Sequence, residues 1–93
     1  MTREEMLLVI LAEECGEVAQ RATKALRFGL DEVQPGQELN NVERLIYEFN
    51  DLFAMMAILE EEGILDTFLR PEMIKDKKAK VEEYLEYSRT SGS

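Results

Sequence analysis

The sequence predicts an all-α fold in which a helical hairpin is followed by a C-terminal helix. Apolar residues recur at intervals of three and four along three segments, which is the spacing of one helix face. Glycine or proline stands at the segment boundaries. No segment reads convincingly as a strand. We therefore expect a single domain over residues 1–89 and a disordered tail over residues 90–93.

The first helix has clear signals at both ends. Thr2 followed by Glu5 predicts a capping box, in which each side chain accepts a hydrogen bond from a free backbone amide. The helical pattern continues through Leu26. Gly29 stands where a left-handed residue commonly ends a helix.

The second helix is predicted over about residues 41–62. It follows a connection over residues 29–40 that contains the turn signal Pro35-Gly36. Asn40 followed by Glu43 resembles a second helix cap. Connections of this length are often functional.

A short apolar patch and a third helix complete the chain. Residues 63–71 hold Ile64, Leu65, Phe68 and Leu69. We expect them to form one or two helical turns that cover the end of the hairpin. Pro71 is suited to the first helical position, and the last helix is predicted over about residues 72–88.

The net charge of −9, from 20 acidic and 11 basic residues, argues against a general nucleic-acid binder. Basic residues nevertheless gather in two places. Some lie close to an acidic motif in the first helix, and others fall within six residues of the last helix, where a solvated helix face is the simpler interpretation. They are Arg21, Lys24 and Arg27, and Lys75, Lys77, Lys78 and Lys80.

The sequence gives no sign of a membrane protein or of a secretory leader. Its longest apolar runs, residues 6–12 and 52–59, fall far short of the roughly 18 residues that a membrane span needs. The N-terminal segment carries Glu4 and Glu5 and lacks a cleavage site. A single cysteine, Cys15, excludes an intrachain disulfide, so we expect a cytoplasmic protein.

Two acidic residues fall on the apolar faces of the first two helices. At about 100° per residue, Leu7, Leu11 and Val18 lie within about 80° of Glu14. Glu48 occupies the same kind of position in the second helix. A buried carboxylate is costly unless it is paired, hydrogen-bonded or bound to a metal. These residues therefore need partners.

Four carboxylates converge if the two helices pack antiparallel. Glu14 and Glu17 are three residues apart, as are Glu48 and Asp51, so each pair shares a helix face. Such a group takes up protons or binds a hard divalent cation. Because the chain has no histidine, the ligands favour Mg²⁺ or Mn²⁺. Mg²⁺ held by carboxylates typically acts on substrate phosphates.

The segments Glu13-Glu14-Cys15-Gly16-Glu17 and Glu48-Phe49-Asn50-Asp51 resemble the two-part signature of a known family. The signature is Glu-Glu-x-x-Glu followed by Glu-x-x-Asp, and the family is the MazG-like all-α nucleoside triphosphate pyrophosphohydrolases. Residues 15–30 and 80–85 also look like small phage and bacterial members, so the resemblance covers most of the chain.

This resemblance implies Mg²⁺-dependent cleavage of nucleoside triphosphates between the α and β phosphates, with Mn²⁺ as a possible substitute. It implies that the metal ligands are Glu14, Glu17, Glu48 and Asp51, with Glu13 as a supporting acid. It further implies that two chains pair their hairpins into a four-helix core, as a homodimer or a dimer of dimers.

Other roles at the site follow from charge and position. Glu13, beside the ligands, is a candidate catalytic base together with Glu14, although a plain surface acid is an equal alternative. Lys24, Arg27, Lys77 and Lys80 are candidate phosphate contacts on the basis of charge.

Two alternatives remain. A phosphoribosyl-ATP or dUTP-type pyrophosphatase of the same fold would use similar phosphate chemistry. A non-catalytic helical interaction module would instead pair its acids with basic residues across the interface, such as Arg21 or Arg44.

Overall fold

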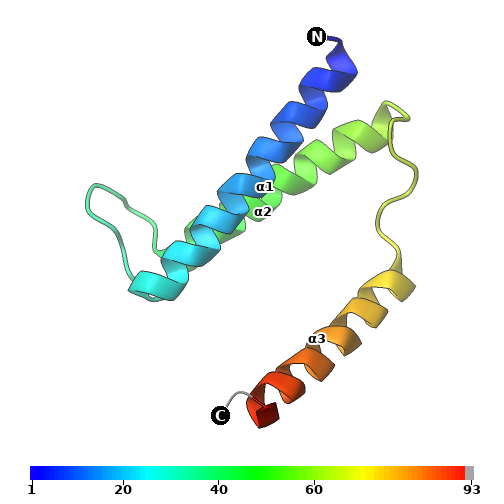
Figure 1. Cartoon of the computed structure of the whole chain (residues 1–93). Helices are drawn as coiled ribbons and strands as arrows, with labels where there is room; N and C mark the ends of the chain where they lie inside the picture. The colour runs from blue at the N-terminus through cyan, green and yellow to red at the C-terminus, as the bar shows by residue number, and fades with distance from the viewer. Residues whose placement is uncertain (92–93) are drawn as a thin grey trace.

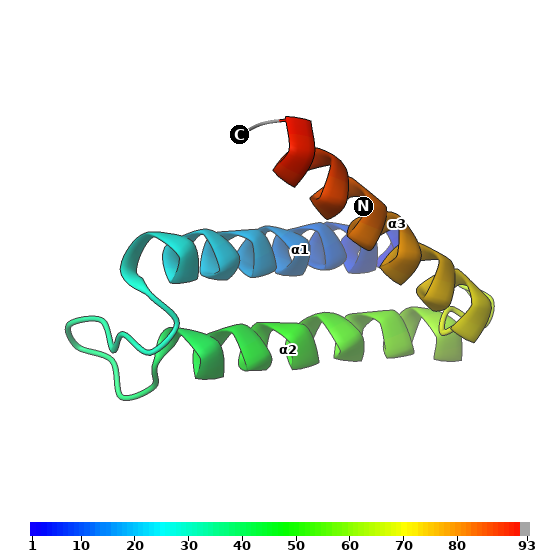
Figure 2. The ribbon, with the colours of Figure 1, turned by 90° about the horizontal axis from the view of Figure 1, so that it is seen from below.

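A computed structural model describes residues 1–91, and over these residues the chain contains three helices and no strand. They are α1 (Arg3–Phe28), α2 (Asn41–Glu61) and α3 (Pro71–Ser91). Helices α1 and α2 lie side by side as an antiparallel hairpin (Figures 1 and 2). The predicted all-α hairpin is therefore confirmed.

Capping fixes the start of α1 as predicted. Thr2 Oγ1 accepts a hydrogen bond from Glu5 N at 3.1 Å, and Glu5 Oε1 accepts one from Thr2 N at 2.9 Å. At the other end, Gly29 has the expected positive φ of 99°, but its ψ of 150° lies outside the left-handed helical region. The chain therefore leaves α1 directly into an extended connection.

The connection over residues 29–40 is tied to the start of α2. Asn40 and Glu43 form the second capping box. Asn41, which is buried, donates its Nδ2 hydrogen bond to the Gly29 carbonyl at 2.7 Å. Arg44 Nη1 donates to Gln34 Oε1 at 3.1 Å. These bonds hold the two helices together at this end of the hairpin.

The apolar core lies toward the opposite end. Leu7 of α1 packs with Met55 and Leu59 of α2, and Leu59 is fully buried. Four partly buried residues surround this group: Leu11, Ile58, Ile64 and Leu65. An ion pair between Arg3 and Glu62, at 2.6 Å, joins the start of α1 to the residue after α2.

The prediction of helical turns within residues 63–71 is wrong. Gly63, with φ 74°, follows the end of α2. The backbone amides of Ile64 and Leu65 both donate to the Leu59 carbonyl, which ends the helix in a turn. Phe68 then packs edge-on against Phe53 of α2, with 5.6 Å between ring centroids. The segment is therefore a turn followed by an extended linker.

Helix α3 begins at Pro71 as expected but runs beyond its predicted end. Thr90 and Ser91, expected in a disordered tail, are helical. Thr90 Oγ1 donates to the carbonyl of Glu86 at 3.0 Å, and Arg89 forms an ion pair with Glu86 at 2.6 Å, so side chains support the last turn. The rest of the predicted tail, Gly92 and Ser93, lies outside the described residues.

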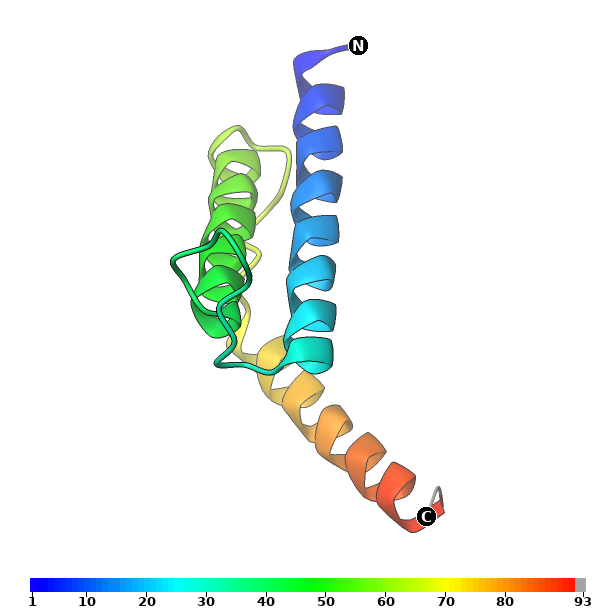
Figure 3. The ribbon, with the colours of Figure 1, turned by 90° about the vertical axis from the view of Figure 1, so that its left-hand side faces the viewer.

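Helix α3 lies apart from the hairpin (Figures 1 and 3). Within residues 1–91, α1 and α2 are the only helices that contact each other, and α3 has no buried residue. Across the same residues, no helix combines the length and the apolar character that a bilayer span requires.

Because Leu59 is fully buried, we expect Leu59→Ala to lower the free energy of unfolding by about 2–5 kcal/mol. Urea denaturation followed by circular dichroism measures the change. Leu30→Ala, at an exposed position in the connection, is the matched control and should change stability by less than about 1 kcal/mol. Equal effects of the two substitutions would contradict the assignment of the core.

Candidate metal centre

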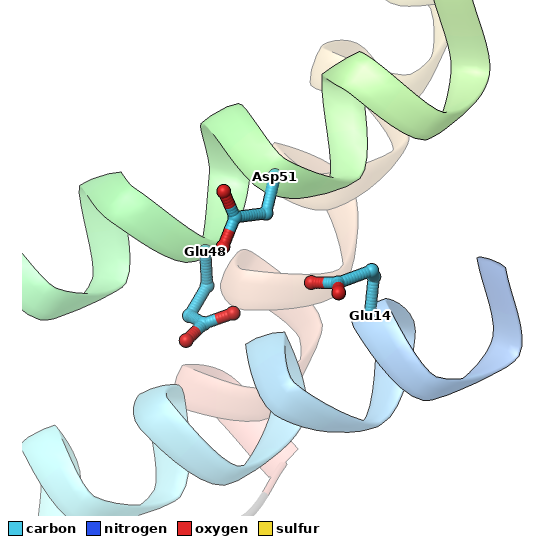
Figure 4. A group of neighbouring side chains, drawn as sticks. All are labelled: Glu14, Glu48 and Asp51. Atoms are coloured by element: carbon cyan, nitrogen blue, oxygen red, sulfur yellow. The ribbon is translucent and has the colours of Figure 1, made fainter. Parts of the chain in front are cut away.

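Three carboxylates from the two helices of the hairpin meet at one place. Glu14 comes from α1, and Glu48 and Asp51 come from α2. Each contributes one carboxylate oxygen, and these oxygens all lie within 4.8 Å of one another. Figure 4 shows the three side chains pointing toward one another between the helices. We call these residues the acidic triad.

Helical periodicity places the acidic triad between the helices. Glu14 is seven residues from both Leu7 and Arg21, which are buried, so it shares their face of α1. Glu48 is likewise seven residues before the buried Met55 on α2. Glu14 and Glu48 are partly buried, whereas Asp51 is exposed at the edge of the group. Two residues of the acidic triad are therefore partly buried, and the third is accessible to solvent.

The carboxylate of Glu14 lies in an unfavourable electrostatic environment. Its Oε2 is buried and has no hydrogen-bond partner among the described residues. Burial raises the pKa of Glu14, and the charges of Asp51, Glu48, Glu17 and Glu13 raise it further, in that order. No basic side chain among residues 1–91 forms an ion pair with Glu14. A proton or a cation would relieve the repulsion.

The acidic triad fits a hard divalent cation. Its donor set consists of carboxylate oxygens only, which suits Mg²⁺ or Mn²⁺ better than zinc or copper. Glu14 Oε2 has no hydrogen-bond partner among the described residues, so its lone pairs are available to a metal ion. Mg²⁺ usually retains several water ligands, and Asp51 is exposed to solvent.

The structure does not bring the other predicted acids into this group. Glu17, the fourth predicted ligand, has an exposed side chain and is not a member of the triad. Glu13 is also exposed. Both remain close enough to Glu14 for their charges to raise its pKa. They therefore form an acidic border of the site on α1.

The predicted phosphate contacts divide between the hairpin and α3. Lys24 and Arg27 lie on α1, where the Arg27 guanidinium stacks on the Phe28 ring at 5.0 Å from its centroid. Lys77 and Lys80 lie on α3, which does not contact the hairpin. Within one chain, therefore, α3 brings neither lysine to the acidic triad.

A small cavity beside Glu48 contains residues that the sequence did not single out as a site. It measures about 170 Å³ and is lined by Gln37, Leu39, Arg44, Tyr47 and Glu48. This volume is below the usual range for small-molecule pockets, so it has room for only part of a nucleotide. Among its lining residues, Glu48 is the one that the sequence predicts to belong to a site, and Tyr47 directly precedes it.

Arg21 and Arg44 do not neutralise the acidic triad. Neither forms an ion pair with these acids in the part of the chain that the structure describes. Arg44 bonds to Gln34 instead. Arg21 is buried, and its Nη1 has no hydrogen-bond partner among the described residues. Within one chain, therefore, neither arginine pairs with the acidic triad.

Because the pKa of Glu14 lies above its ordinary value of 4.5, the folded state binds its proton more tightly than the unfolded state does. Without divalent cations, stability should fall as the pH rises from about 4.5 through the raised pKa. Glu14→Gln should reduce this fall and increase stability at pH 7. Urea denaturation between pH 4 and 8 in EDTA tests this, with Glu38→Gln as an exposed control. An unchanged pH profile in Glu14→Gln would contradict it.

Comparisons of the chain with protein-family models, with curated proteins and with solved structures found no match. Its function is therefore proposed from the acidic triad and its surroundings.

Proposed function

We propose that this chain is a Mg²⁺-dependent nucleotide pyrophosphohydrolase, which cleaves NTPs or dNTPs between the α and β phosphates to give a nucleoside monophosphate and pyrophosphate. The observation that carries the proposal is the acidic triad, with its buried and unpartnered Glu14 oxygen. A cluster of carboxylates without a basic partner is suited to a cation and, through it, to a polyphosphate.

Glu14, Glu48 and Asp51 would hold Mg²⁺, or Mn²⁺ as a substitute. When bound, the ion supplies positive charge that attracts phosphate oxygens and stabilises the charge that develops on them. Glu13, exposed and adjacent to Glu14, is the candidate to accept a proton from the attacking water. Glu17, the fourth acid implied by the family signature, is one helical turn from Glu14 and would support the site from its border.

The arrangement of motifs supports the assignment to the MazG-like family. The Glu-Glu-x-x-Glu segment lies in α1 and the Glu-x-x-Asp segment lies in α2, so the hairpin brings the two parts of the signature together. Lys24 is seven residues after Glu17 and shares its side of α1, where it would contact substrate phosphates. Arg27, on the next turn, is the second such candidate.

The exposed surface of the hairpin supports pairing with a second copy into a four-helix core. Along α1 a series of exposed apolar residues follows the alternating spacing of four and three that is typical of packed helices. In an antiparallel hairpin, apolar residues of α2 lie on the same side. The α1 series is Leu8, Ala12, Cys15, Ala19, Ala22 and Leu26, and the α2 residues are Val42, Ile46, Phe49, Phe53 and Met56.

This pairing would give a homodimer or a dimer of dimers. The partners of the chain are then a second copy and a nucleotide, with no role for nucleic acid or a membrane. A cytoplasmic location fits this proposal, because nucleoside triphosphates and a reduced cysteine are both found there.

The alternative of a non-catalytic module has weaker support, because it requires the acids to be paired with arginines. Arg44 donates to Gln34, and the Glu14 Oε2 atom has no partner in the described residues. Phosphoribosyl-ATP and dUTP remain possible substrates of the same acidic triad.

Phosphorus NMR of the purified chain with Mg²⁺ and a panel of NTPs, dNTPs and phosphoribosyl-ATP tests the reaction. We expect pyrophosphate and a monophosphate. Glu14→Gln and Glu48→Gln should each reduce turnover at least about 100-fold without loss of helical circular dichroism, because electrostatic contacts at a reacting phosphate typically have effects of this size. Glu38→Gln is the control. No pyrophosphate from any substrate, with Mn²⁺ also tried, would overturn the proposal.

Cation binding can be tested without a substrate. A ligand that binds only the folded state stabilises it, by about 2.7 kcal/mol at 100 times its Kd. Millimolar MgCl₂ or MnCl₂ should therefore raise the Tm of the wild-type chain but not that of Glu48→Gln. NaCl at matched ionic strength controls for general screening of the net charge. If both variants respond equally, the acidic triad is not the cation site.

A further inference from the structure

Helix α3 has an apolar side that is exposed in the part of the chain that the structure describes. Met73, Ile74, Val81, Tyr84 and Leu85 lie along this side, and each is at least 41% exposed. No residue of α3 is buried, and the helix contacts neither α1 nor α2 (Figure 3). An isolated amphipathic helix of this kind is marginal in water and gains most of its stability from packing.

The linker before α3 is fixed to α2 as far as Phe68. Phe68 packs on Phe53 of α2, and its backbone amide donates to Glu60 Oε2 at 3.4 Å. Arg70 Nε donates to the Thr67 carbonyl at 2.8 Å. Only Leu69 and Arg70 lie between the packed Phe68 and Pro71, where α3 begins. With Phe68 fixed on α2, only Leu69 and Arg70 can change the direction in which α3 leaves the hairpin.

The solvent-accessible area of the chain is larger than that expected of a folded monomer of its mass. A folded monomer of 10.7 kDa is expected to expose about 5,500 Å². This chain exposes 7408 Å², roughly 1,900 Å² more than that expectation. Two copies would thus have almost 4,000 Å² to bury, which is within the range of obligate homodimers. Contact with one second copy could therefore bury the whole of this excess area.

Charge is distributed so that α3 complements the hairpin. Residues 1–70 contain 15 acidic and 6 basic residues and so carry the whole net charge of −9. Residues 71–91 contain five of each, and four of the basic ones are lysines within residues 75–80. The basic start of α3 therefore attracts the acidic hairpin of another chain more strongly than its remaining turns do.

One side of α1 carries apolar residues followed by acidic ones, and α3 carries a basic residue followed by apolar ones. The two orders are complementary when the helices run antiparallel. Met6, Ile10, Glu13 and Glu17 are exposed and spaced four, three and four residues apart, so they share one side of α1. On α3, Lys77 comes before Val81 and Leu85. When the two helices run antiparallel, the apolar residues of α3 meet Met6 and Ile10 while Lys77 meets the two acids.

We propose that α3 is an exchanged arm: it packs antiparallel against α1 of a second copy, with its apolar side on Met6 and Ile10 and its lysines beside Glu13 and Glu17 of that copy. The exchange is reciprocal in a two-fold dimer, so both arms are covered. Lys77 and Lys80 would then border the acidic triad of the second copy. The packing itself does not depend on the hydrolase reaction, and its test uses no nucleotide.

Sedimentation velocity over a range of concentrations tests the exchange. Val81→Glu should weaken dimerisation on the order of 100-fold, because each dimer contains the altered contact twice. Ala79→Glu adds the same charge on the opposite side of α3 and should change the dimer Kd less than about threefold. Circular dichroism checks that neither variant loses more helical signal than α3 alone contributes, so that the α1–α2 hairpin is intact in both. Equal Kd values for the two variants, or a wild-type chain that stays monomeric, would overturn the proposal.

Isotope-filtered NOE spectra of a mixture of ¹³C-labelled and unlabelled chains identify the docking partner. We expect intermolecular NOEs from the Val81 and Leu85 methyl groups to Met6 and Ile10. NOEs from α3 to its own hairpin alone, or to no other helix, would show that the arm is not exchanged. Neither outcome would bear on the metal centre, so the two proposals can fail separately.

Discussion

The repulsion among carboxylates in the middle of the hairpin is the constraint on which the rest of the structure depends. Antiparallel pairing of α1 and α2 forces Glu14 to face Glu48 and Asp51, and no basic side chain among residues 1–91 pairs with them. Apolar residues at these positions would have extended the core and stabilised the hairpin. The sequence instead places carboxylates between the two helices, where apolar side chains would contribute most to stability. Such a placement is a common sign of a functional site.

The remaining contacts compensate for this cost at the two ends of the hairpin. The core of Leu7, Met55 and Leu59 and the Arg3–Glu62 ion pair lie at one end. The hydrogen bonds of Asn41 and Arg44 to the connection lie at the other end. Much of the apolar surface of the helices faces outward, so a single chain buries little of it. Stability and assembly are linked in such a design.

The features that were predictable from the sequence depend on local rules. The capping boxes at Thr2 and Asn40 and the positions of Glu14 and Glu48 on apolar faces follow from spacing along one helix. Features that involve contacts between elements were not predictable. The linker packs through Phe68 onto Phe53 of α2 rather than forming helical turns. Glu17 shares the spacing of a ligand, but its rotation around α1 leaves it exposed.

The division of the hairpin into two fastened ends has a mechanical consequence. The acidic triad lies between these ends, and its members belong to different helices, so its width is set by the distance between two helix axes. A helix held at both ends can bow slightly at its centre without breaking the contacts that hold it. A bend at the centre of either helix would change the separation of Glu14 from Glu48 and Asp51 while the capped ends and the core stay in place.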